Sequence, residues 1–265
     1  MNFKDKLIWI TGASSGIGEH LAYAFAREGA KLILSSRKTA ALEKVKDACA
    51  DPQKVAIVPL DVADLEAVKQ TAKTVLDTHG LPDILVNNAG ISQRALAVET
   101  VVEVDQQIMQ VNYFGTVALI KALLPEMIRQ RKCHIVSMSS VMGIFGAPWR
   151  TAYCASKHAM NGFHEGLRAE LHPYGIPVTV LMPGYVNTNV TINALKGDGT
   201  PNAVKAKTTA GGWDPEYFAK RALRVIARRK KEAVLAGPRE RLAVFLKRFL
   251  PPVLHIVLNG LKPSE

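Results

Sequence analysis

The feature that most constrains this fold is a regular alternation of short apolar runs with longer segments of helical periodicity. The apolar runs predict strands at residues 7–11, 31–36, 54–60, 83–86, 133–138, 177–182 and 233–236. The periodic segments predict helices at residues 16–28, 39–50, 64–78, 101–129, 151–171 and 214–229. Such alternation implies βαβ units with right-handed crossovers. We therefore predict an α/β fold, a doubly wound and mainly parallel sheet of about seven strands with helices on both faces.

The chain is predicted to form a single domain, because no linker or change in composition interrupts the alternation before about residue 185. Residues 187–213 are a polar, Gly-rich insertion, which we expect to be a mobile substrate lid. The domain is predicted to span residues 1–237. Residues 238–265 form a basic and apolar C-terminal extension.

A glycine-rich stretch joins the first predicted strand to the first predicted helix. Its glycines follow the spacing G-x-x-x-G-x-G. Glycine lets backbone amides approach a pyrophosphate, and a helix N-terminus supplies positive partial charge. A glycine-rich turn without a ligand is the alternative. The position in the chain favours a dinucleotide site in a Rossmann-type domain, with contacts from Gly12, Ser14, Ser15, Gly16, Ile17 and Gly18.

The end of the second predicted strand indicates which dinucleotide binds. An acidic residue at this place hydrogen-bonds the free ribose hydroxyls of NAD(H). This chain has Ser36 and Arg37 there instead, and a guanidinium suits a 2′-phosphate. The alternative is a solvated arginine at the start of a loop. We therefore predict NADP(H) as the cofactor in preference to NAD(H).

Tyr153 and Lys157 are four residues apart in a predicted helix, so their side chains share one face. A phenol has a pKa of about 10, and an ammonium at roughly 4 Å favours the phenolate by up to about 3 pKa units. The pair thus predicts a tyrosine with a pKa lowered toward neutrality, suited to acid–base catalysis. A surface contact without chemistry is the alternative for the pair taken alone.

Several motifs occur together in one order along the chain: Thr11–Gly18, Asn87-Asn88-Ala89-Gly90, Asn112, Ser140, Tyr153-x-x-x-Lys157 and Pro183-Gly184. With these motifs the chain resembles the short-chain dehydrogenase/reductase family over roughly residues 5–237. The resemblance implies that Tyr153 is the acid/base and that Lys157 lowers its pKa and holds the nicotinamide ribose. It implies that Ser140 polarises the substrate carbonyl, and that Asn112 interrupts a helix and positions a relay water.

The same resemblance implies further cofactor contacts at the carboxyl ends of the strands. Asp61 corresponds to the residue that contacts the adenine amino group, with Val62 beside it. The turn on the ribose side corresponds to Asn88, Ala89 and Gly90. The segment that meets the nicotinamide carboxamide corresponds to Pro183, Gly184, Val186 and Thr188.

The lid residues predict a lipophilic substrate. The expected apolar wall consists of Val190, Ile192, Ala194, Leu195, Val204 and Trp213, opposite Phe145, Trp149 and Tyr185. Two basic residues, Arg94 and Arg150, are candidates for binding a substrate carboxylate. We expect a lipophilic ketone, an aldehyde or a secondary alcohol.

The net charge of +11 is concentrated near the C-terminus, because residues 220–265 hold 12 Lys/Arg and three acidic residues, leaving 22 basic and 20 acidic residues before them. In the extension these basic residues alternate with Leu, Phe and Val, which is typical of an interfacial anchor for anionic lipid. The extension and lid resemble the hydroxysteroid-dehydrogenase and membrane-associated reductase branch. A helix that closes the pocket or forms an oligomer interface is the alternative. No base-reading motif accompanies the charge, so we expect no nucleic-acid partner.

The remaining composition predicts a cytoplasmic enzyme, peripheral at a membrane surface if the extension binds lipid. Three cysteines make a disulfide framework improbable, the polar residues 1–6 predict no signal peptide, and no apolar run reaches the roughly 20 residues of a spanning helix. The seven histidines show no ligand spacing, so no metal is expected. A homodimer or homotetramer is expected.

Together these features predict an NADP(H)-dependent oxidoreductase that interconverts a lipophilic ketone or aldehyde and its alcohol, with Tyr153 as acid/base. The alternative within enzymes is a 3-oxoacyl reductase acting on carrier-protein- or CoA-linked groups. Outside enzymes, the alternative is a nucleotide-binding regulatory protein that keeps the fold without turnover.

Overall fold

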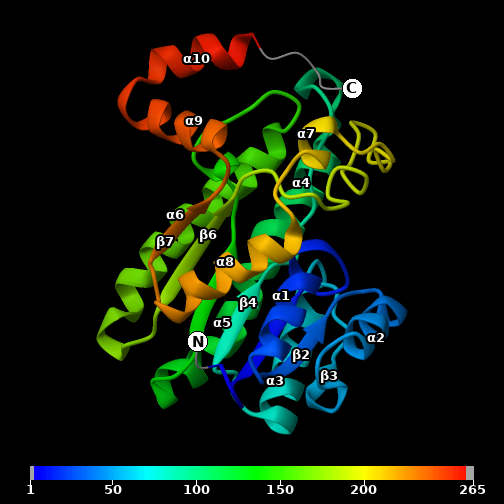
Figure 1. The fold of residues 1–265 in the computed structure, drawn as a ribbon, viewed down its shortest axis with the longest axis vertical. Helices are drawn as coiled ribbons and strands as arrows, with labels where there is room; N and C mark the ends of the chain where they lie inside the picture. The colour runs from blue at the N-terminus through cyan, green and yellow to red at the C-terminus, as the bar shows by residue number, and fades with distance from the viewer. Residues whose placement is uncertain (1–2, 261–265) are drawn as a thin grey trace.

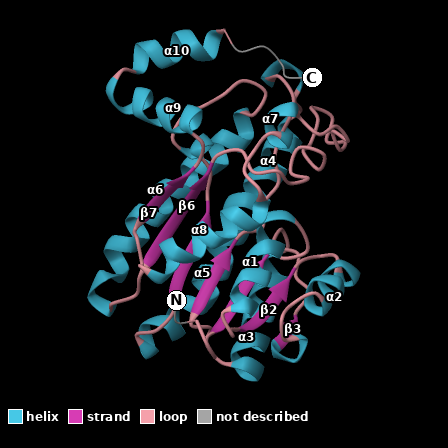
Figure 2. Cartoon of the chain, viewed as in Figure 1, coloured by secondary structure: helices cyan, strands magenta, loops and turns pink. Residues whose placement is uncertain are grey.

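A computed structural model describes residues 3–260, and at its centre lies one sheet of seven parallel strands (Figures 1 and 2). The strands are β1 (Leu7–Thr11), β2 (Lys31–Ser35), β3 (Val55–Ile57), β4 (Ile84–Asn87), β5 (His134–Met138), β6 (Val178–Pro183) and β7 (Glu232–Leu235). Their order in the sheet is β3-β2-β1-β4-β5-β6-β7. The order reverses between β1 and β4, which opens a crevice at their carboxyl ends, where such sheets bind ligands. The predicted doubly wound α/β fold is confirmed.

One face of the sheet is covered by three helices: α1 (Gly16–Arg27), α2 (Thr39–Asp47) and α8 (Pro215–Ala227). Their apolar stripes bury Phe25, Leu42 and Phe218 completely against the strands. Each side chain of this size contributes about 1.5–3 kcal/mol when removed from water. The amphipathic spacing read from the sequence therefore sets which side of each helix faces the sheet.

The other face is covered by α3 (Leu65–His79), α5 (Gly115–Gln130) and α6 (Thr151–Leu171). Trp9 of β1 is fully buried on this face, and its Nε1–H donates a hydrogen bond of 2.8 Å to the hydroxyl of Ser35. That bond satisfies the one polar atom of an otherwise apolar side chain. It also ties β1 to the end of β2.

The predicted helix at residues 101–129 is interrupted in the structure. It consists of α4 (Val102–Met109), a π-helical turn (Gln110–Phe114) and α5. In the described residues this stretch, Val102–Gln130, is also the one helix with the length and mean hydropathy (1.2) to cross a membrane. Leu119, Ile120 and Leu123 are fully buried against the sheet, so the apolarity of α5 is that of a core helix.

The insertion between β6 and α8 is tied to the domain at its base and along its length. Backbone hydrogen bonds join Asn187 N–H to Trp213 O (2.9 Å) and Trp213 N–H to Tyr185 O (2.9 Å). Further along, Leu195 N–H donates to Ser92 O at 2.8 Å. The insertion holds one short helix, α7 (Lys207–Ala210). Short 3₁₀ turns elsewhere are η1 (Pro52–Lys54), η2 (Ala97–Glu99), η4 (Val141–Gly143) and η5 (His172–Tyr174).

The C-terminal extension forms two helices, α9 (Pro238–Phe249) and α10 (Pro251–Asn259), which lie at the end of the molecule beyond the carboxyl ends of β6 and β7 (Figure 1). Leu254 of α10 is 1% exposed and packs in a cluster with Met142 and Phe145, which follow β5. Tyr153 lies against the same cluster. The extension therefore packs beside the catalytic residues, while its residues 261–265 lie outside the described part of the chain.

Candidate active site

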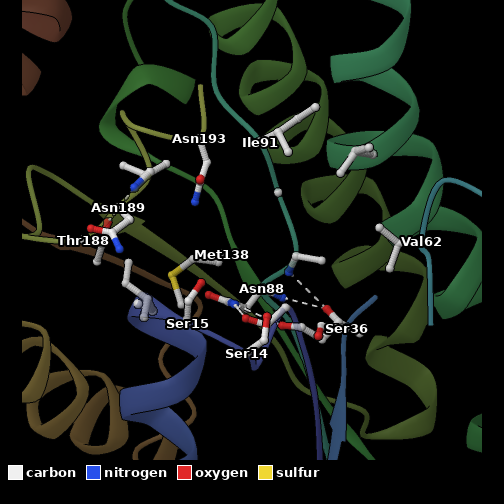
Figure 3. A pocket seen from close by; sticks show the side chains of 18 of the residues that line it. Ser14, Ser15, Ser36, Val62, Asn88, Ile91, Met138, Thr188, Asn189 and Asn193 are labelled. Carbon is white, nitrogen blue, oxygen red and sulfur yellow. Dashed lines mark hydrogen bonds between the residues drawn. The ribbon is translucent and has the colours of Figure 1, made fainter. Parts of the chain in front are cut away.

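A cavity of about 480 Å³ lies at the carboxyl edge of the sheet (Figure 3). It is lined by the loop after β1, the ends of β2, β4, β5 and β6, and the start of the insertion. Apart from the catalytic residues and Gly18, sixteen residues were predicted to contact the cofactor. All sixteen line this cavity: Gly12, Ser14, Ser15, Gly16, Ile17, Ser36, Arg37, Asp61, Val62, Asn88, Ala89, Gly90, Pro183, Gly184, Val186 and Thr188. Ser140, Tyr153 and Lys157 line the same cavity. Gly18 and Asn112 are absent from its lining.

Gly12 and Gly18 let the loop after β1 close against the turn after β4. Gly12 has φ +64°, and a Cβ there would lie 2.7 Å from the Cα of Ala89. A Cβ on Gly18 would lie 2.3 Å from the carbonyl oxygen of Gly12. The amide of Asn88 donates to the same carbonyl at 3.1 Å. Gly18 thus shapes the loop from beneath and does not face the cavity.

The N-terminus of α1 faces the cavity from this loop. Ser15 is the N-cap residue, yet its side chain makes no capping hydrogen bond. The first N–H of the helix, that of Gly16, donates to the Glu19 carboxylate at 3.2 Å, and the following N–H groups and the positive partial charge of the helix are available to an anion. Across from it, Thr188 packs over Gly16, where a Cβ would meet the threonine at 3.2 Å. This arrangement fits a dinucleotide pyrophosphate held between the loop and the insertion.

The end of β2 supplies the basic side of the cavity. Ser36 and Arg37 line it as expected, and Lys38 lines it as well. The Ser36 hydroxyl accepts a hydrogen bond of 3.1 Å from Lys38 N–H, which turns the chain back toward α2. Lys38 was not among the predicted cofactor contacts, although its place directly after Arg37 in the sequence indicates a basic turn.

The catalytic hydroxyls meet at the end of β5. Ser140 caps the 3₁₀ turn η4, because its Oγ accepts from Met142 N–H at 3.1 Å. Its hydroxyl donates toward Pro183 O at 3.4 Å. Tyr153, from the first turn of α6, lines the same cavity, and Ser140 favours the ionised form of its phenol and so acts to lower its pKa. Three distant stretches of chain therefore bring two hydroxyls to one point of the cavity wall.

Lys157 lies one helical turn after Tyr153 and is 4% exposed. Its Nζ donates to the carbonyl oxygen of Met138 at 2.8 Å and lies 5.7 Å from the centroid of the Tyr153 ring. Burial lowers the pKa of Lys157 to about 8. The ammonium is thus anchored to β5 and sits beneath the tyrosine ring.

The expected lowering of the Tyr153 pKa is not what this chain produces by itself. Burial raises the pKa of the phenol, while the Ser140 hydrogen bond and the charge of Arg150 oppose that rise. The phenolate loses water, and the Lys157 ammonium donates to Met138 O. Tyr153 and Lys157 share one face of α6 as expected, but burial outweighs the groups that favour the phenolate, which are Ser140 and Arg150.

Asn112 lies in the π turn and is fully buried. Its Oδ1 accepts from Ile91 N–H at 2.8 Å, and its Nδ2 donates to Ile91 O at 2.9 Å and to Ser156 Oγ at 2.9 Å. These bonds clamp the turn after β4 to α6. The expected interruption of the helix is present, and the proposed water relay at Asn112 stays a prediction.

The substrate side of the site is more polar than expected. A smaller cavity of about 60 Å³ adjoins Ser140 and Tyr153, and Arg150, Tyr185 and Val190 also line it. Much of the expected apolar wall lies elsewhere: Val204 is 57% exposed, Phe145 is buried against α10, and Trp213 packs in the core with α1 and α8. These side chains lie in irregular segments, where the sequence has no periodicity from which the direction of a side chain can be predicted.

Two buried histidines near the sheet do not contact the cavity. The pKa of His134 and that of His164 are each lowered to about 4, chiefly by burial. His134 Nε2 donates to Thr179 Oγ1 at 2.7 Å, because the threonine hydroxyl itself donates to Lys230 O. Within the described part of the chain, no group of three or more His, Cys, Asp and Glu side chains is placed to hold a metal ion.

Comparison with known proteins places this geometry in context. A family model described as short chain dehydrogenase matches residues 6–198. The chain is 43% identical over 264 residues to dehydrogenase/reductase SDR family member 7B of Xenopus laevis, covering 96% of this chain and 81% of the relative. It is 45% identical over 264 residues to dehydrogenase/reductase SDR family protein 7-like of Anopheles gambiae, covering 97% and 83%.

Solved structures agree in fold and carry different cofactors. A short chain dehydrogenase/reductase from Burkholderia phymatum in complex with NAD has a TM-score of 0.82 at 25% identity, covering 100% of this chain and 99% of that one. An alcohol dehydrogenase from Thermococcus sibiricus, complexed with 5-hydroxy-NADP, has a TM-score of 0.73 at 28% identity, covering 89% and 97%. The choice between the two dinucleotides therefore rests on the residues of this chain.

Proposed function

Because this chain belongs to the short-chain dehydrogenase/reductase family, we propose that it is an NADP(H)-dependent oxidoreductase that interconverts a lipophilic ketone or aldehyde and its alcohol. The observation that carries the proposal is the convergence of Ser140, Tyr153 and Lys157 on one cavity with the glycine loop of β1. A nucleotide cradle and a proton donor in one cavity suit the coupled transfer of a hydride and a proton.

Each catalytic side chain has a role that follows from its contacts. In the direction of reduction, the Tyr153 hydroxyl donates its proton to the carbonyl oxygen of the substrate. The Ser140 hydroxyl, which lines the cavity beside Tyr153, turns from Pro183 O to donate to that oxygen and stabilises the negative charge that develops on it. The dinucleotide, when bound, supplies the hydride. The raised pKa of Tyr153 keeps the phenol protonated and ready to donate at neutral pH.

Lys157 acts on Tyr153 from below. Its ammonium stabilises the phenolate that is left after proton donation, since the two groups lie on one face of α6. It also lies close to Gly90, where a Cβ would come within 3.6 Å of Nζ. We propose that Lys157 reaches the ribose hydroxyls of the cofactor over this glycine.

The preference for NADP(H) is supported by the residues at the end of β2. Arg37 and Lys38 put two positive charges at this end of the cavity, and Ser36 adds a hydroxyl. A 2′-phosphate is recognised well by a guanidinium fork and by point charges. The carboxylate that would favour free ribose hydroxyls is replaced here by Ser36.

A cofactor-switch variant tests this assignment. Ser36→Asp with Arg37→Leu places a carboxylate where the 2′-phosphate would lie and removes the guanidinium. The ratio of kcat/KM for NADPH to that for NADH should invert, because repulsion replaces attraction. Arg131→Asp, on the exposed turn after α5, lowers the net charge by the same two units and serves as a charge-matched control. An unchanged ratio in the double variant would contradict the assignment.

The rival activities make different demands on a substrate panel. Stopped-flow oxidation of NADPH on free lipophilic ketones supports the proposal. Activity confined to carrier-protein- or CoA-linked 3-oxoacyl groups would support a 3-oxoacyl reductase instead. Binding of NADPH without turnover on either class would support a nucleotide-binding regulatory protein. The homodimer or homotetramer stays a prediction, which light scattering of the purified protein can test.

A further inference from the structure

The cavity beside the Ser140 and Tyr153 hydroxyls is lined by a positively charged side chain that has no role in the proposed reaction. Arg150 lines this cavity of about 60 Å³ together with Ser140 and Tyr153. No acidic residue is part of its described lining. Among residues 3–260, no acidic side chain forms an ion pair with Arg150. A positive charge beside the reacting carbonyl requires an explanation.

The backbone and an aromatic ring hold Arg150 at this place. It is the N-cap residue of α6, three residues before Tyr153. The preceding Trp149 has φ +62°, a strained conformation for a bulky residue, and its carbonyl accepts from Ala95 N–H at 3.2 Å. The Arg150 guanidinium carbon lies 5.7 Å from the centroid of the Tyr185 ring. The guanidinium is therefore stacked within the site and is partly shielded from solvent.

A second guanidinium adds to the positive field. The pKa of Arg94 is lowered, first by burial and second by the charge of Arg150, and the Tyr185 hydroxyl group is near enough to oppose that effect. An anion that approaches both arginines would offset the repulsion that Arg150 exerts on Arg94. The same field reaches Tyr153, where Arg150 favours the phenolate.

We propose that Arg150, supported by Arg94, binds an anionic group of the substrate, a carboxylate or a phosphate monoester located a few bonds from the reacting carbonyl. This inference rests on the proposed function. The guanidinium fork matches either group bidentately. The short reach follows from the size of the cavity that Arg150 shares with Ser140 and Tyr153. The lipophilic part of the substrate extends instead along Val190 and Leu195, which line the larger cavity.

Matched ketones test this subsite. Three substrates share one alkyl chain and one ketone and differ in the group near the carbonyl, which is a methyl ester, a carboxylate or a phosphate monoester. The wild-type protein should show a kcat/KM at least tenfold higher for one of the two anions than for the ester. The anion that is preferred shows whether the site binds a carboxylate or a phosphate monoester.

Variants of Arg150 complete the test. Arg150→Gln should reduce the anion-to-ester ratio of kcat/KM by about 10- to 100-fold, mainly through KM, and Arg150→Lys should restore part of it. Lys73→Gln, on the exposed side of α3, is the charge-matched control. Equal losses on ester and anion in Arg150→Gln, or no preference in the wild type, would overturn the inference. The absence of turnover on all three ketones would instead count against the proposed function.

A second and independent observation concerns the outer surface of α9 and α10. Seven large apolar side chains on this surface are 43–73% exposed: Leu242, Phe245, Phe249, Leu250, Val253, Ile256 and Val257. Leu242, Phe245 and Phe249 recur at i, i+3 and i+7, so they form one stripe along α9. The opposite side packs inward through Ala243, Leu246 and Leu254. The two helices thus pack on the domain with one side, and the apolar stripe on their other side stays exposed.

The charges around the apolar stripe have one sign. Arg239, Arg241, Lys247 and Arg248 are all exposed. The single acidic residue of α9 and α10, Glu240, is turned inward, where its carboxylate accepts from Tyr185 N–H at 3.2 Å. Arg241 and Arg248 are spaced i and i+7, so they run beside the stripe. Exposed apolar side chains with flanking cations match a bilayer interface that carries anionic lipid.

We propose that the stripe of α9 and α10 docks on an anionic membrane surface. The test is flotation of the full chain with vesicles of phosphatidylcholine, with or without about 30% phosphatidylserine, a content high enough for a strong negative surface potential. The wild-type protein should float with the anionic vesicles and be released by 0.5 M salt, a concentration at which screening is strong. Phe245→Ser with Phe249→Ser and Ile256→Ser should reduce flotation at least tenfold.

A matched control replaces apolar residues exposed elsewhere. Val98→Ser with Val102→Ser, before and in α4, should float like the wild type. Wild-type protein that stays unbound, or a triple variant that floats normally, would refute the proposal. Light scattering adds a further outcome: loss of a dimer in the triple variant, without any vesicle binding by the wild type, would identify the stripe as an interface between two copies.

Discussion

Replacing the buried Lys157 by methionine should stabilise the cofactor-free protein while it destroys activity. Lys157 is 4% exposed, and burial lowers its pKa from 10.5 to about 8. The folded state therefore disfavours the protonated amine that the unfolded state keeps. Methionine fills a similar volume beside Met160 without any charge to desolvate.

The size of the effect follows from the two pKa values. The unfolded chain binds the proton more tightly, so wild-type stability rises with pH between about 8 and 10.5 and the penalty is complete below pH 8. The penalty at pH 7 is about 3 kcal/mol, and most of it, about 2–3 kcal/mol, is relieved between pH 7 and pH 10. The lost hydrogen bond to Met138 O reduces the net gain of the variant at pH 7 to about 1–2 kcal/mol.

Urea unfolding followed by the fluorescence of the three tryptophans, of which Trp9 is fully buried, measures this effect at pH 7 and pH 10. Lys157→Met should be more stable than the wild type by about 1–2 kcal/mol at pH 7, whereas at pH 10, where most of the wild-type penalty is relieved, the wild type should be equally or more stable. Lys121→Met, a substitution of an exposed lysine on α5, controls for general effects of charge removal. A difference between wild type and Lys157→Met that stays constant across the two pH values would refute the reasoning.

Three further predictions concern other parts of the molecule. Tyr153→Phe should lower kcat/KM by about 10²–10⁴-fold while NADPH affinity, measured by fluorescence titration, stays within about threefold; a similar loss of affinity would contradict the acid/base role. His134→Gln should reduce the loss of stability between pH 7 and pH 4.5 by about 2 kcal/mol, because a folded-state pKa of about 4 against 6.5 makes stability fall as pH drops through that window; parallel pH profiles in thermal unfolding would argue against it. Gly162→Ala, in the open face of α6, should raise the free energy of unfolding by about 0.5–1 kcal/mol, whereas Gly115→Ala should lower it by about 1–3 kcal/mol, since its Cβ would meet Val62 O at 2.3 Å. Equal denaturation midpoints for the two glycine variants would be the contrary outcome.

The sheet was predictable because its strands are buried on both faces. Such strands are continuous apolar runs, and their helices carry stripes at the period of 3.6 residues, so order and type of element are visible in the sequence. The carboxyl ends of those strands then place Ser140, Pro183 and Asn88 at one edge. The glycine loop could be predicted as a dinucleotide-binding loop from its position between β1 and α1.

Features that depend on packing in three dimensions were not predictable. The insertion has no periodicity, so Trp213 and Val204 were assigned to a pocket wall that neither joins. The direction of the Tyr153 pKa depends on burial, which the spacing of Tyr153 and Lys157 does not reveal. Asn112 was singled out through resemblance alone, because an asparagine in a helix carries no signal of a π turn.

The π turn at Gln110–Phe114 also fixes the length of the chain at this point. Its wider turn accommodates an extra residue between α4 and α5. Deleting one residue there would restore regular α-helical hydrogen bonding and leave α4 and α5 in nearly the same relative orientation, because the wider turn absorbs the extra residue locally. Val104 and Ile108, which are 2% and 0% exposed, would therefore keep their packing against Ala152 and Leu195. Asn112, which lies in the turn itself, would shift and lose its hydrogen bonds to Ile91 and Ser156. The number of residues at this turn is thus tied to the position of the Asn112 side chain and not to the packing of the two helices.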